Sequence, residues 1–212
     1  MKLYDAIVLL LGFEPGPLVR AVASHNLKVN GRIIVFMPTF HDERAERAWN
    51  DFTRILSMML EQRSVNIERV EVNLTNMALA VKQVRQILSS LYNMNTAIIF
   101  TGGMRALALA VYIAYLLIDW KVKPNVEVYL EGQGYTVSIP NVTSILSLDI
   151  SRERLEVLKV LSERPKSTIE IAKELGKDRS TIHRHLDWLQ RRGLVKRENK
   201  TYKLTSLGQL LA

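Results

Sequence analysis

The chain has 212 residues, of which 48% are hydrophobic, and its 29 basic and 21 acidic side chains give a net charge of +8. This composition excludes a disordered chain and allows one large domain or two smaller ones. The absence of cysteine excludes disulfide scaffolds, cysteine zinc sites and cysteine nucleophiles. The longest apolar run, 106–118, is shorter than the ~20 residues of a membrane span, and the start lacks the pattern of a signal peptide. We therefore expect a cytoplasmic protein with no membrane association.

Residues 1–150 alternate between two hydrophobic periods. Strand-like runs cover 3–11, 32–37, 67–73, 96–101 and 126–131. Helical patterns lie between them, over 15–28, 42–62, 76–91 and 104–120. This alternation predicts an α/β fold with a Rossmann-like, mostly parallel sheet flanked by helices. The runs "YTVSI" and "VTSILSL" on either side of Pro140 predict an added antiparallel hairpin.

The pattern changes near residue 149, so we place one domain at 1–148 and a second at 149–212. A helix that ends before Pro165 is followed by "STIE", a capping box in which Ser167 caps and Glu170 stands at N3. A further helix runs from its cap Asp178 to Gly193, and an alternating segment with a turn at 198–200 follows. This order predicts a small winged helix-turn-helix domain.

The second domain carries nearly all the charge excess. Residues 151–212 hold 15 basic and 8 acidic side chains, against 14 and 13 in residues 1–150. A local excess of this kind favours a polyanion, here double-stranded DNA. The residues expected to contact DNA, from the third helix and the wing, are Arg179, Ser180, Thr181, His183, Arg184, Lys196, Arg197 and Lys200. The alternative is a solvated basic domain or a dimerisation module.

Metal binding and catalysis find little support in the sequence. His183 and His185 are two residues apart and therefore project to different faces of their helix, whereas helical metal ligands need three- or four-residue spacing. His41, followed by Asp42 and Glu43, reads as a helix start with acids in its first turn. We assign no metal ligand, no catalytic residue and no cofactor.

Two strand-to-helix junctions of the first domain are rich in glycine. They are "LLLGFEPGPLVRAV", with Gly12 and Gly16, and "TGGMRALALAV", with Gly102 and Gly103. Such junctions offer helix N-terminal amides to an anion at the strand tips. Neither is a P-loop or a G-x-G-x-x-G fingerprint, and Glu14 suits a ribose hydroxyl or an exocyclic amine. The junctions favour a nucleotide that is only partly anionic, with tight turns and a solvated arginine as the alternative.

The motifs "GFEPGPLVRAV" and "TGGMRALALAV", followed by a winged helix, resemble archaeal CRISPR-associated regulators. Those pair a CARF (CRISPR-associated Rossmann fold) domain with a MarR-like winged helix. The resemblance implies a homodimer that binds a cyclic oligoadenylate, often the tetra-adenylate, across its two-fold axis. It assigns ligand binding to Gly12, Phe13, Glu14, Gly102, Gly103, Met104 and Arg105. From their place at a strand tip, in "MPTFHDER", we add Thr39 as a hydroxyl donor and Phe40 as a stacking face.

Together these features predict a ligand-responsive transcriptional regulator of a CRISPR system, and not an enzyme. Three alternatives stay open. They are a ring nuclease that cleaves its cyclic ligand, a regulator that senses another nucleotide or metabolite, and a DNA-binding protein without a ligand. The last alternative leaves the double glycine and Arg105 without a function.

Overall fold

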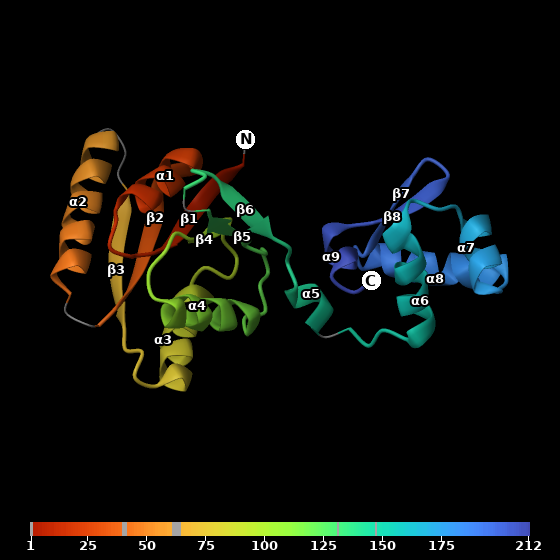
Figure 1. The fold of residues 1–212 in the computed structure, drawn as a ribbon. Coiled ribbons are helices and arrows are strands. Elements are labelled where there is room, and N and C mark those ends of the chain that lie inside the picture. The colour runs from red at the N-terminus through yellow and green to blue at the C-terminus, as the bar shows by residue number, and fades with distance from the viewer. Residues whose placement is uncertain (1, 40–41, 61–64, 131, 147) are drawn as a thin grey trace. The chain divides into compact units, whose positions relative to one another are not determined.

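The computed structural model describes residues 2–39, 42–60, 65–130, 132–146 and 148–212 (Figure 1). The chain divides into two compact units, Met1–Ile139 and Pro140–Ala212. Within the described residues, no helix is both long enough and apolar enough to cross a membrane.

A six-stranded sheet forms the first unit, with the strand order β3-β2-β1-β4-β5-β6. Its strands are β1 Leu3–Leu10, β2 Asn26–Pro38, β3 Asn66–Val72, β4 Thr96–Phe100, β5 Asn125–Tyr129 and β6 Thr136–Ile139. All neighbouring pairs are parallel except β5 and β6, which are antiparallel. The order reverses between β1 and β4, so this sheet has a switch point between those strands. The predicted Rossmann-like, mostly parallel sheet is confirmed.

Helices cover both faces of the sheet (Figure 1). They are α1 Gly16–Ser24, α2 Glu43–Met59, α3 Met77–Ser89 and α4 Arg105–Leu116. Alternate residues of β1 enter two separate cores: Ile7 packs with residues of α1 and α2, and Val8 with residues of α3 and α4. Both side chains are fully buried. A central parallel strand buried on both faces explains why its sequence is apolar at every position after Asp5.

Two predicted elements of this unit were wrong. The first predicted helix was to reach residue 28, but α1 ends at Ser24 because β2 begins at Asn26 and pairs with Leu3 of β1. The hairpin across Pro140 does not form. Instead β6 pairs with β5 through a turn in which Gly132 and Gly134 have φ of +77° and +76°, and Thr143–Leu146 is the short helix α5.

The second unit is a winged helix, as predicted. Its further elements are α6 Arg152–Glu163, α7 Thr168–Leu175, α8 Arg179–Arg191, β7 Val195–Glu198, β8 Thr201–Leu204 and α9 Ser206–Gln209. Strands β7 and β8 form the antiparallel wing. Ile145 and Leu148 pack against the core of this unit, so the division of the chain falls at 139/140, before the boundary expected at 148/149.

Polar contacts fix the start of α7. Ser167 and Glu170 form the predicted capping box, and the Ser167 bonds together with the Arg164 guanidinium lower the pKa of Glu170 to about 2. Next to the cap, the Lys166 ammonium lies 2.8 Å from both Glu163 of α6 and Glu174 of α7. The backbone of Lys166 also pairs with Tyr202 of the wing. One residue therefore joins both helices and the wing.

Candidate functional site

The two glycine-rich junctions lie side by side at the switch point of the sheet. Thr101, which follows β4, is buried and donates from Oγ1 to the Leu10 carbonyl oxygen of β1 at 2.7 Å. The Leu10 amide donates back to the same hydroxyl at 3.3 Å. In open α/β sheets the carboxyl ends of the strands at this point are where ligands bind.

Close packing of the two loops explains both Gly12 and Gly103. A Cβ atom on Gly12 would lie 2.9 Å from the Gly103 nitrogen, and one on Gly103 would lie 2.6 Å from the Leu11 carbonyl oxygen. Gly103 also has φ of +86°, which side chains rarely adopt. By contrast, a Cβ on Gly16 would contact nothing within 4 Å. The contact between the two loops therefore requires glycine at positions 12 and 103, whether or not a ligand approaches.

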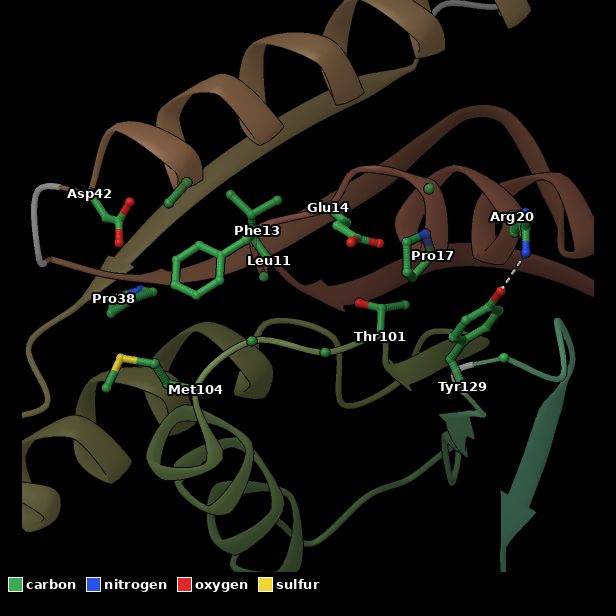
Figure 2. Close-up of a pocket in the computed structure, with 16 residues that line it drawn as sticks. Leu11, Phe13, Glu14, Pro17, Arg20, Pro38, Asp42, Thr101, Met104 and Tyr129 are labelled. Carbon is green, nitrogen blue, oxygen red and sulfur yellow. Dashed lines mark hydrogen bonds between the residues drawn. The ribbon is translucent and has the colours of Figure 1, made fainter.

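A cavity of about 610 Å³ opens at these loops (Figure 2). This volume is in the range of small-molecule sites, ~300–1,000 Å³. Residues of the two loops and of the neighbouring strand and helix ends line it: Leu11, Gly12, Phe13, Glu14, Gly16, Pro17, Arg20, Pro38, Asp42, Ala45, Thr101, Gly102, Gly103, Met104, Tyr129 and Gly132.

Six of the residues predicted to bind the ligand line this cavity, namely Gly12, Phe13, Glu14, Gly102, Gly103 and Met104. Arg105 and Thr39 are exposed and are not among its lining residues. The Thr39 amide donates to the Val72 carbonyl oxygen at 3.1 Å. Phe40 lies outside the described residues.

Sequence reasoning missed four polar residues that line the cavity, namely Arg20, Asp42, Thr101 and Tyr129. Arg20 Nη1 donates to Tyr129 Oη at 3.0 Å, as Figure 2 shows. Arg20 stands one turn into α1, and helical side chains lean toward the N-terminus, which here is the cavity end. Tyr129 is the last residue of β5, so the rule that ligands bind at strand tips points to it as well.

A charged group stands beside Phe13 at the rim. The Arg44 guanidinium carbon lies 4.1 Å from the centre of the Phe13 ring. Arg44 also donates from Nη2 to the Asp42 carboxylate at 2.9 Å, and this bond lowers the pKa of Asp42 below its usual range. The aromatic ring is thus held at the cavity by a cation–π contact whose cation is itself fixed.

The helices that begin at the cavity differ in their caps. The α2 helix is capped by the Asp42 side chain. In α1 and α4 the N-cap residues, Pro15 and Met104, make no side-chain cap bond, and neither helix has an acid in its first turn. The first amides of α4 remain available, whereas Pro17 leaves the first turn of α1 only the Gly16 and Leu18 amides. Two helix ends of this kind form a favourable environment for an anion.

The second unit presents the residues predicted to contact DNA on its surface. Arg179, Ser180, His183 and Arg184 of α8 are exposed and Thr181 is half-buried, while Lys196, Arg197 and Lys200 of the wing are exposed. Glu198 pairs with Lys196 at 3.1 Å and with Lys203 at 2.7 Å. Among the described residues no salt bridge engages Arg179, Arg184 or Lys200, so these cations face solvent.

Comparison with known proteins agrees with this architecture. Residues 5–140 match the family model described as Csa3 CRISPR-associated Rossmann-like domain. Residues 144–212 match the HVO_A0261 N-terminal domain. No curated protein matches the chain.

Two solved structures show distant likeness. The reduced form of MarR from E. coli is 31% identical over 32% of this chain and 52% of its own, with a TM-score of 0.30. Can2 from Sulfobacillus thermosulfidooxidans, in complex with cyclic tetra-adenylate, is 16% identical over 97% of this chain and 63% of its own, with a TM-score of 0.41. The chain spans less than two thirds of the length of either protein.

The fold and the domain match together define a CRISPR-associated protein with an N-terminal Rossmann-like domain and a C-terminal winged helix. Because the family model covers more than half of its length, the chain belongs to the Csa3 family. The resemblance read from the two glycine motifs is confirmed.

The loop contact gives a prediction about stability. Gly103→Ala would place a methyl group 2.6 Å from a carbonyl oxygen at a positive φ, so we expect it to lower the free energy of unfolding by ~1–3 kcal/mol. Gly16→Ala, with open space around its Cβ, is the matched control and should change stability little. Urea denaturation measures both, and equal stability of the two variants would contradict the loop-packing argument.

Proposed function

We propose that the protein is a transcriptional regulator of a CRISPR system that binds DNA through its winged helix and senses a cyclic oligoadenylate in the switch-point cavity. The observation that carries the proposal is the meeting of the uncapped N-termini of α1 and α4 at one cavity. Phosphate groups fit those free amides. The family to which the chain belongs supports the choice of ligand.

The rest of the cavity fits the other parts of a nucleotide. Glu14 offers acceptor oxygens to a ribose hydroxyl or an adenine amine. Phe13 and Met104 supply an aromatic ring and an apolar surface, and an adenine base can pack on both. A ligand with several alternating phosphates and adenosines would use all three kinds of contact.

A second copy of the chain would complete the site. Leu109, Ile113 and Leu117 follow each other at four-residue spacing and are 57%, 38% and 54% exposed. Arg105 begins the same row of α4. Residues in such a row lie on one helix face, so a partner that covers the leucines also meets Arg105. A two-fold pairing along α4 would bring two arginines to a ligand at the axis.

The proposed DNA contacts follow from the placement of α8. Its N-terminal residues would read base edges in the major groove, and the wing would reach neighbouring phosphates. Two such units in a dimer fit a pseudo-palindrome with half-sites ~34–36 Å apart. The ligand changes DNA affinity only if it binds one arrangement of the dimer more tightly than the other.

The first test is calorimetric titration of cyclic tetra-adenylate into the full chain. We expect one ligand per two chains, recovered intact afterwards, and loss of binding by Arg105→Ala. Arg85→Ala removes the same charge from the exposed surface of α3 and should bind normally. The absence of binding by the wild type would refute the proposed ligand.

The dimer is tested separately by Leu109→Glu. A carboxylate in the apolar row of α4 should prevent pairing, because an unpaired charge buried in an interface costs several kcal/mol. Light scattering should show a monomer that no longer binds the ligand. Met58→Glu on α2, where the side chain is 68% exposed, is the control, and a dimeric Leu109→Glu would rule out this interface.

DNA binding is tested by Arg184→Ala, which should weaken affinity for operator DNA by ~10-fold or more and leave ligand binding intact. Lys159→Ala removes an equal charge from α6 and should have a smaller effect. Wild-type affinity should fall steeply as salt rises, as expected for phosphate contacts. An Arg184→Ala variant that binds like wild type would show that α8 is not the recognition helix.

A further inference from the structure

Arg20 has a neutral partner that a phosphate can replace. Among the described residues that line the cavity, Arg20 is the only one with a basic side chain. It donates to the Tyr129 hydroxyl at 3.0 Å. A guanidinium prefers an anionic acceptor, because charge-assisted hydrogen bonds are about twice as strong as neutral ones. A phosphate entering the cavity would therefore compete with Tyr129 for Arg20.

Tyr129 belongs to the hairpin that forms one wall of the cavity. It ends β5 and lies opposite Thr136 of β6. The turn between them is closed by the Leu130 amide, which donates to the Tyr135 carbonyl oxygen at 3.0 Å, and by the Gly134 amide, which donates to the Leu130 carbonyl oxygen at 3.2 Å. Arg20 Nη1 also stands 3.7 Å from where a Gly134 Cβ would be, so Arg20 contacts the turn as well as the tyrosine.

The same hairpin is the covalent route out of the first unit. Strand β6 ends at Ile139, and Pro140 begins the second unit. β6 is the last strand of the sheet and pairs only with β5 within the described sheet. An edge strand held on one side opens more readily than a central strand. Tyr129 itself lies on β5, but it is the partner of Thr136, the first residue of β6. A change at Tyr129 therefore acts beside the start of a weakly held strand that leads directly to the winged helix.

A second contact holds this hairpin to α1 from outside the cavity. His25 Nε2, at the C-cap of α1, lies 3.3 Å from Glu127 Oε1 of β5. Glu127 in turn accepts from the Thr136 hydroxyl of β6. Because this contact does not involve a residue lining the cavity, a ligand leaves it in place. The Arg20–Tyr129 bond is the contact that a ligand can exchange.

We propose that Arg20 binds a phosphate of the ligand, and that its transfer from the Tyr129 hydroxyl to that phosphate frees the tip of the β5–β6 hairpin and carries the signal along β6 to the DNA-binding unit. The inference rests on the proposed function and names the residue pair through which that function is regulated. No other change in the cavity is required.

The test is Tyr129→Phe, which keeps the ring and removes the acceptor for Arg20. Without ligand, this variant should bind operator DNA as the liganded wild type does. In the wild type, cyclic tetra-adenylate should change the affinity for DNA by the about 5- to 150-fold typical of allosteric coupling. In Tyr129→Phe the same ligand should change that affinity by less than about 2-fold. Its ligand affinity should rise by about 2- to 10-fold, because no internal bond must be broken. Simple structural damage would lower that affinity instead.

Two further variants sharpen the result. Arg20→Gln should weaken cyclic tetra-adenylate binding by about 10- to 100-fold, since a charged hydrogen bond to phosphate is lost. Tyr4→Phe is the matched control: its hydroxyl accepts from Asn125 Nδ2 at 3.1 Å, outside the cavity. This control should respond to the ligand like wild type.

A measurement on the wild type covers the case in which Tyr129→Phe does not fold. Ligand should speed amide hydrogen exchange in residues 130–139, and unchanged or slower exchange there would overturn the inference. A wild type that responds to ligand while Tyr129→Phe responds equally also overturns it, and leaves the proposed function standing. If the wild type does not bind the ligand, or if the ligand does not change its affinity for DNA, both this inference and the proposed function are overturned.

Discussion

The contact between the loop after β1 and the loop after β4 is the constraint on which the first unit depends. Adjacent parallel strands bring both loops to one edge of the sheet, and Thr101 joins the strand ends. The backbones then approach so closely that neither Gly12 nor Gly103 has room for a side chain. Because the loops are pinned together, the helices that follow them, α1 and α4, both begin at one cavity. The meeting of two helix N-termini at one cavity thus follows from strand order and two missing side chains.

This contact also changes the meaning of the double glycine. From the sequence, adjacent glycines before Arg105 pointed to close approach by a ligand or to a tight turn. In the structure the close approach is made by the neighbouring loop, and Gly103 faces the Leu11 carbonyl oxygen. In the proposed function, such glycines would act on the ligand only indirectly, because they set the distance between the two helix ends that would hold it.

Much of the fold could be predicted because periodicity and caps are local. The apolar runs 6–11, 33–37 and 97–100, which lie in or at the ends of β1, β2 and β4, and the capping box at Ser167 each indicate their own element. The errors arose where residues distant in sequence determine the secondary structure or the position of a side chain. Asn26 joins a strand because Leu3 pairs with it, and Arg20 reaches the cavity because Tyr129 of a remote strand holds it there. Arg105 is a third case: its motif is local, but a single chain leaves it outside the cavity, and its predicted role depends on a second copy.

Lys166 has a consequence for how such a protein would respond to its signal. Its ammonium joins α6 to α7 while its backbone joins both to the wing, so helices and wing hold one shape relative to each other. A ligand bound in the other unit would then displace the reading surface as a whole and would not remodel it. The preferred operator sequence would stay the same in both states, and only its occupancy would change.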